Sequence, residues 1–118
     1  MTRLSEPRSK SIMKTLFATL FALAALAPAK PVFTGTITDS VCANADHAPM
    51  RMGPTDAECT KACVEEHDAK YVLYDGKQTY ELSDQRTPEK FAGQKVRVTG
   101  TKGDKKKMIR VESIAAKK

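Results

Sequence analysis

The fold class is decided by residues 71–82, which read Tyr-Val-Leu-Tyr-Asp-Gly-Lys-Gln-Thr-Tyr-Glu-Leu. Two short runs rich in β-branched and aromatic residues flank an Asp-Gly pair. A strand, an Asp-Gly turn and a second strand are typical of a β-hairpin. We therefore expect strands at 71–74 and 79–82, joined at Asp75-Gly76.

Three further strands are predicted around this hairpin. Apolar residues alternate with threonines over residues 32–42, and residues 95–101 repeat the period of two with Val96, Val98 and Gly100 inward. The last predicted strand covers residues 106–114, where the apolar residues break the alternation and indicate a bulge.

One helix is predicted at residues 56–67. Thr55 and Glu58 have the spacing of a capping box, in which each side chain satisfies a backbone amide of the first turn. A single helical turn is expected to begin at Thr87-Pro88-Glu89 and to end at Gly93, because proline favours the first helical position.

The predicted order is β-α-β-β-β-β, mainly β with one short helix. Closure of five strands removes exposed sheet edges, so we expect a small OB-like β-barrel. The alternative is an open antiparallel sheet with the helix packed on one face. Residues 30–118 are expected to form this single domain, with a cysteine-rich loop and helix at 42–68.

Residues 1–29 have the pattern of a cleavable signal peptide. A basic segment precedes the uncharged run 15–29, which ends in Ala27-Pro28-Ala29. The run has 15 residues, whereas a spanning helix needs about 20, so a membrane anchor is the weaker alternative. We expect cleavage before Lys30, export to the periplasm or the extracellular space, and no stable membrane insertion. Translation can start at Met1 or at Met13, which itself precedes a compact signal sequence.

Charge gives little support for a nucleic-acid ligand. Residues 1–29 hold four of the 20 Lys and Arg and one of the 14 Asp and Glu, so residues 30–118 carry a net charge of +3 rather than +6. The basic excess therefore lies partly in the signal segment. An unidentified envelope protein or polymer is the expected partner, and oligomeric state is left open.

All cysteines and histidines lie between residues 42 and 67. They are Cys42, His47, Cys59, Cys63 and His67, with Met50 and Met52 among them. Export makes a disulfide the default fate of paired cysteines, and a bond from Cys42 to Cys59 or Cys63 would join the first strand to the helix. A bond between Cys59 and Cys63 is less favourable, because side chains four apart on a helix lie parallel. Three is an odd number, so one cysteine stays free, pairs between chains or does chemistry.

A metal site is the alternative for this segment. Cys59, Cys63 and His67 recur at successive helical turns, and Cys42, His47 or Met50 can complete the coordination from the loop. Thiolates and thioethers suit copper, and Cys with His also suits zinc. A third hypothesis is thiol redox chemistry at Cys59, which requires an exposed thiol of low pKa near a helix N-terminus.

No motif predicts an enzyme. The sequence has no phosphate-binding glycine loop and no nucleophile elbow. Asp39, Glu81 and Asp84 form a weak carboxylate candidate at strand ends. Three tyrosines on the hairpin strands, Tyr71, Tyr74 and Tyr80, are candidates for ligand stacking, although packing in the core is more common.

Several segments together resemble a family of small exported bacterial proteins of unknown function. The segments are Phe33-Thr-Gly-Thr-Ile-Thr-Asp-Ser40, Glu58-Cys-Thr-Lys-Ala-Cys-Val64, Tyr71-Val-Leu-Tyr-Asp-Gly76, Tyr80-Glu-Leu-Ser-Asp-Gln85 and Val96-Arg-Val-Thr-Gly-Thr101. The resemblance implies export, an OB-like barrel and a cysteine-containing loop-helix insertion. It implies no catalytic residue.

Overall fold

The computed structural model describes residues 29–104 and 107–118. The predicted signal peptide lies outside these residues, except for Ala29. The described part contains one α-helix, five strands and two 3-10 turns, in the order β1 (Val32–Asp39), η3 (Ala48–Met50), α1 (Asp56–Glu66), β2 (Tyr71–Tyr74), β3 (Thr79–Leu82), η4 (Thr87–Phe91), β4 (Lys95–Lys102) and β5 (Met108–Ala116). Among the described residues, no helix is both long and apolar enough to cross a membrane.

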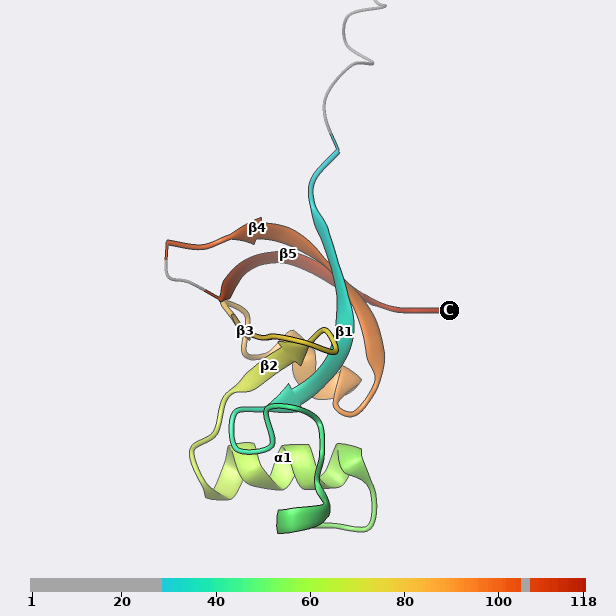
Figure 1. The fold of residues 1–118 in the computed structure, drawn as a ribbon, viewed down its shortest axis with the longest axis vertical. Helices are drawn as coiled ribbons and strands as arrows, with labels where there is room; N and C mark the ends of the chain where they lie inside the picture. The colour runs from blue at the N-terminus through green and yellow to red at the C-terminus, as the bar shows by residue number, and fades with distance from the viewer. Residues whose placement is uncertain (1–28, 105–106) are drawn as a thin grey trace, which may run out of the picture.

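The five strands close into a barrel in the order β1-β2-β3-β5-β4, with β4 returning to β1 (Figure 1). Neighbouring strands are antiparallel, except for β3 and β5, which are parallel. The prediction of a small five-stranded OB-like barrel is confirmed, and the open-sheet alternative is wrong. The hairpin turn at Asp75-Gly76 is also present, with Gly76 at a φ of 100° that glycine tolerates best.

The predicted irregularity in the last strand is present as a register shift between β4 and β5. Thr99 pairs with Ser113 and Gly100 pairs with Val111, so Glu112 has no partner across the ladder. One extra residue on one strand is a β-bulge, which bends the strand. The bend helps a short strand to follow the curvature of a closed barrel.

Alternating side chains from all five strands fill the barrel. Ile37, Leu73, Val96, Val98 and Ile109 are fully buried at its centre. Tyr71 and Tyr80 belong to the same core, and Phe33 packs against Tyr80 with ring centroids 5.8 Å apart. Two of the three tyrosines considered for ligand stacking are therefore core residues.

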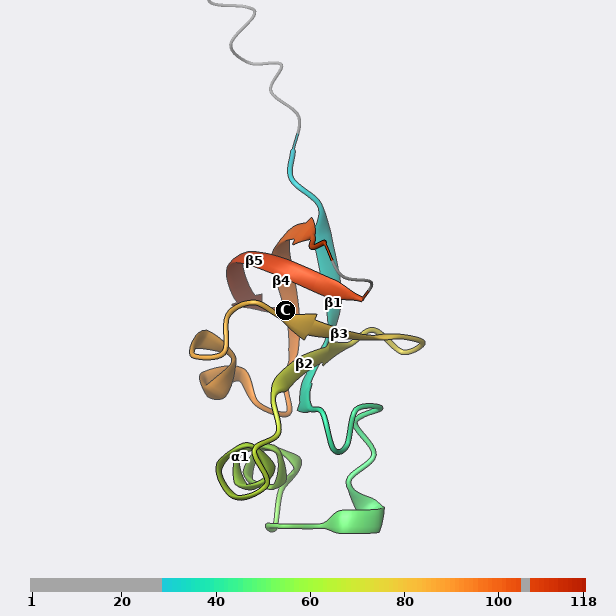
Figure 2. The ribbon, with the colours of Figure 1, turned by 90° about the vertical axis from the view of Figure 1, so that its left-hand side faces the viewer.

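The connection from β1 to β2 lies at one end of the barrel, where α1 crosses beneath the strands (Figures 1 and 2). The two ends of this connection are hydrogen-bonded to each other. The Ser40 N–H donates to the Lys70 carbonyl at 2.9 Å, and the Lys70 N–H donates to the Ser40 hydroxyl at 2.9 Å. The helix packs against β1. This placement brings the cysteines of the helix next to the end of the first strand.

Strand β1 ends at Asp39 rather than at residue 42 as expected. The chain turns there because Asp39 Oδ1 accepts the backbone N–H groups of Val41 and Cys42, each at 2.9 Å. Thr38 and Asp39 are both fully buried although consecutive strand residues face opposite sides. Part of the following loop, including His47, therefore covers the outer face of the strand end.

Candidate metal centre

Two of the three cysteines come from successive turns of α1. Thr55 caps the helix by accepting the Glu58 N–H at 3.1 Å, and its hydroxyl donates to the Glu58 carboxylate at 3.0 Å. The cap fixes where the helix starts, and residues four apart then share one face. Cys59 and Cys63 lie on that face and are fully buried against the barrel end.

The third cysteine comes from the loop after β1. Cys42 is 6% exposed, and its backbone N–H is held by the buried Asp39 carboxylate. Its carbonyl oxygen accepts the Thr38 hydroxyl at 2.8 Å. Two buried polar contacts therefore fix the backbone that presents the thiol.

The sulfur atoms of Cys42, Cys59 and Cys63 all lie within 4.8 Å of one another. The sequence predicts that Cys42 meets the helix cysteines, and the structure places it there. The predicted disulfide is not formed in the structure, where all three residues are free thiols. Three convergent thiols are a donor set for a thiophilic metal ion.

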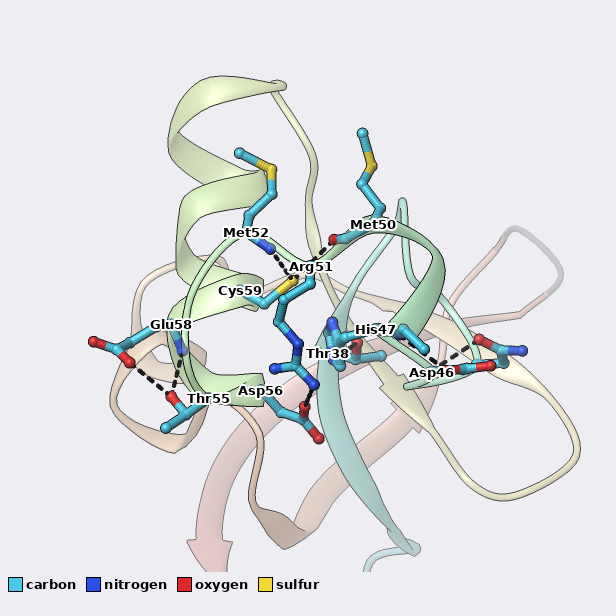
Figure 3. A network of polar contacts seen from close by, with 12 residues as sticks. Thr38, Asp46, His47, Met50, Arg51, Met52, Thr55, Asp56, Glu58 and Cys59 are labelled. Atoms are coloured by element: carbon cyan, nitrogen blue, oxygen red, sulfur yellow. Dashed lines mark hydrogen bonds and ion pairs between the residues drawn. The ribbon is translucent and has the colours of Figure 1, made fainter.

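The Cys59 thiol forms hydrogen bonds with the loop that precedes the helix (Figure 3). Its sulfur accepts the Met52 N–H at 3.3 Å, and its S–H donates to the Met50 carbonyl at 3.3 Å. The Met52 thioether lies 3.8 Å from the Cys63 sulfur. A fourth sulfur therefore lies beside the Cys63 thiol.

A second group of donors shares Cys42. Ligand atoms of Asp39, Cys42 and His47 also lie within 4.8 Å of one another. Asp39 is fully buried and His47 is 3% exposed. Both have a buried side-chain atom with no hydrogen-bond partner, Oδ2 of Asp39 and Nδ1 of His47.

The contact with Thr38 indicates which ring nitrogen of His47 is the hydrogen-bond donor (Figure 3). The Thr38 hydroxyl donates its only proton to the Cys42 carbonyl, so it can act only as an acceptor toward His47 Nε2, 3.5 Å away. Nε2 is then a donor to Thr38, and in the tautomer with its single proton on Nε2 the Nδ1 atom has a free lone pair. This is the state in which histidine binds a metal.

Burial and negative neighbours suppress ionisation of the thiols. Burial raises the pKa of Cys63 to about 12, with further contributions from Asp39, Cys59 and Cys42. Burial followed by the charge of Asp39 raises the pKa of Cys42 as well. Both thiols are therefore protonated at neutral pH in the metal-free domain, and a bound metal must displace their protons.

Two residues expected near the site are placed differently. His67 ends the helix as its C-cap, with φ −118° and ψ 13°, and its side chain is exposed. Met50 lies in η3 and is 41% exposed, and its backbone carbonyl accepts the Cys59 S–H.

The redox hypothesis for Cys59 is not supported by its burial. Cys59 lies near the start of the helix as the hypothesis requires, but its thiol is fully buried, whereas thiol exchange needs an accessible sulfur.

Sequence reasoning misses two residues of the site. The sequence groups Asp39 with the strand-end acids Glu81 and Asp84, yet Asp39 is the buried residue that holds Cys42. Met52 stands out only as a neighbour of Met50, and its position two residues further along the chain places its sulfur beside Cys63. The available sequence signal for Asp39 is an aspartate at the end of a predicted strand, because an aspartate side chain there can accept the backbone N–H groups of an Asx turn.

Residues 63–117 match a family described as protein of unknown function (DUF5818). The match covers less than half of the chain and starts at Cys63, so it does not extend over Cys42, His47 and Cys59. The expected similarity to a family of unknown function is confirmed over this part. Neither the curated proteins nor the solved structures contain a match to the chain.

Proposed function

We propose that this domain binds a thiophilic metal ion, Cu⁺ or Zn²⁺, through Cys42, Cys59 and Cys63. One observation carries the proposal: three buried thiols from a loop and a helix have their sulfur atoms within 4.8 Å of one another. The domain holds the ion and performs no catalytic step.

The surroundings of the thiols favour metal binding over simple packing. A buried cysteine commonly behaves as a small apolar residue, and one such residue needs no ligand. Here two separate segments converge, and the Met52 N–H already points at the Cys59 sulfur at 3.3 Å. This contact fixes the position of the Cys59 sulfur beside the loop. The Met52 thioether adds a donor that is typical of Cu⁺ sites.

The test is a competition titration of the reduced protein with Cu⁺ and with Zn²⁺ against chelators of known affinity. Replacing Cys59 by Ser should weaken binding of the preferred ion by more than about 100-fold. Loss of a residue that only hydrogen-bonds to a metal ligand typically lowers metal affinity by ~10–100-fold, and loss of a ligand itself should lower it further. His67→Ala is the matched control, since His67 is exposed at the end of the same helix. Equal affinity in the wild-type protein and in the Cys59→Ser variant would refute the proposal.

A second candidate is a structural disulfide from Cys42 to Cys59 or Cys63, the function expected first from the sequence. The same short sulfur separations favour it, because a small side-chain movement joins two of the three thiols. Such a bond closes a loop of about 20 residues and typically stabilises a domain by ~2–4 kcal/mol. Metal binding and the disulfide exclude each other at Cys42, so the redox state of the isolated protein separates them.

The proposed compartment is the periplasm or the extracellular space, reached through residues 1–29 as a cleaved signal peptide. The basic segment, the short apolar run and Ala27-Pro28-Ala29 support this assignment. N-terminal sequencing of the exported protein should begin at Lys30. Paired thiols form disulfides in that compartment, so the proposed metal site has to be loaded before the cysteines are oxidised. An envelope protein or polymer is the proposed partner.

A further inference from the structure

We infer that Asp39, Cys42 and His47 form a second metal position, which shares the Cys42 thiolate with the first. The inference rests on the proposed function, because the shared thiolate belongs to the thiol site. Zinc is the ion that this second donor set suits, since zinc accepts carboxylate, thiolate and imidazole ligands together.

The two groups of donors meet at one residue. Ligand atoms of Asp39, Cys42 and His47 lie within 4.8 Å of one another, and so do the three sulfur atoms. Cys42 is the member common to both groups. A thiolate sulfur has several lone pairs and can bridge two ions, so the two groups are compatible with simultaneous occupation.

Two buried polar atoms in the second group have no partner. Buried polar atoms are almost always hydrogen-bonded, and an exception in a folded protein calls for an explanation. The two atoms are Asp39 Oδ2 and His47 Nδ1. In the His47 tautomer with its proton on Nε2, both orphan atoms are acceptors with free lone pairs. A cation that both side chains ligate satisfies both atoms at once.

The charge at the barrel end after metal has displaced the thiol protons is compatible with two ions. With the thiols deprotonated, Asp39, Cys42, Cys59 and Cys63 hold four negative charges there. None of the buried residues described in the structure is a lysine or an arginine. The nearby Arg51 is 44% exposed at its side chain and pairs with Asp56 at 3.1 Å (Figure 3). Uncompensated buried charge is strongly unfavourable, and two divalent ions neutralise four negative charges where one leaves half of them.

The test is the zinc stoichiometry of the reduced full domain, measured by native mass spectrometry after titration with zinc alone. The wild-type protein should bind two zinc ions per chain. His47→Ala and Asp39→Asn should each bind one, and His67→Ala, which alters the exposed histidine, should still bind two. Asp39→Asn keeps an oxygen that can accept the Cys42 N–H, and His47→Gln replaces His47→Ala if that variant fails to fold by circular dichroism.

The outcomes separate the two proposals. One zinc in the wild-type protein, with unchanged affinity in Asp39→Asn and His47→Ala, overturns the second position and leaves the thiol site intact. One zinc whose affinity collapses in His47→Ala also overturns it, because His47 is then the fourth ligand of a single ion. No zinc and no Cu⁺ in the wild-type protein overturns the proposed function itself.

Discussion

Asp39 holds Cys42: the Asp39 Oδ1 atom accepts the Cys42 backbone N–H at 2.9 Å, and it accepts the Val41 N–H at the same distance. These two contacts end strand β1 and turn the chain toward α1. The last residue of the strand thereby decides where the first thiol of the site lies. Asp39 is fully buried, so its carboxylate is shielded from water.

The first prediction separates the turn from the charge of Asp39. Asp39→Ala removes the acceptor of two backbone N–H groups, and it should lower the free energy of unfolding by about 1–3 kcal/mol, the cost of leaving a buried donor unsatisfied. Asp39→Asn keeps an oxygen acceptor and should lose much less. Urea denaturation of the metal-free domain measures both values. Equal losses in the two variants would contradict the role of the oxygen acceptor and assign the effect to the carboxylate charge.

The second prediction concerns the contact between Gly93, which follows η4, and the start of α1. Gly93 has a φ of 77°, and a side chain there would place its Cβ 2.9 Å from the Ala57 nitrogen. Gly93→Ala therefore combines backbone strain with a steric contact against the first turn of the helix. Gly76→Ala is the matched control, because Gly76 has a φ of 100° and a Cβ added there would meet nothing within 4 Å.

Both glycine variants should be less stable than the wild-type protein. Strain alone costs about 1–3 kcal/mol, and overpacking adds about 1–3 kcal/mol more in Gly93→Ala. Gly93→Ala should also weaken metal binding, since it displaces the turn that precedes Cys59. Urea denaturation of the two variants measures the difference. A Gly93→Ala variant as stable as Gly76→Ala would contradict the contact between this glycine and α1.

The third prediction is a pH dependence at the hairpin turn. The Asp75 carboxylate accepts the N–H groups of Gln78 at 2.7 Å and Lys77 at 2.8 Å, and these bonds lower its pKa below the ordinary value of 3.8. A group with a lowered pKa in the folded state stabilises the fold above its unfolded pKa and loses this effect as the pH falls through the folded value. The advantage of the wild-type protein over Asp75→Asn should therefore shrink as the pH falls below about 3.8. A stability difference that is constant from neutral pH to pH 2 would contradict the role of the carboxylate charge.

The barrel can be predicted from the sequence because its signals are local. The alternation over 32–42, the Asp-Gly turn and the capping threonine each indicate an element without reference to the rest of the chain, although the first strand ends at Asp39. Closure then follows from the need to cover sheet edges. The bulge is also visible, because the apolar residues of β5 break the period of two.

The site can be predicted only in part, because it depends on contacts between segments. The approach of Cys42 to the helix cysteines is predictable, since all three residues lie in the connection between β1 and β2. Helical periodicity also suggests His67, but the chain leaves the helix there, so the residue no longer follows the face of Cys59 and Cys63. The burial of Asp39 could not be predicted, because it arises only when the loop folds back over the strand end.

Metal binding, rather than a disulfide, is proposed to join the three thiols. The most direct measurement is the native intact mass of the protein exported by a bacterial host and purified without reductant, with thiol alkylation after denaturation. We predict a mass that includes at least one copper or zinc ion, and three thiols that become alkylated once the metal is removed. A metal-free mass lower by two hydrogens, with one alkylatable thiol, would contradict the proposal and assign Cys42 to a structural disulfide.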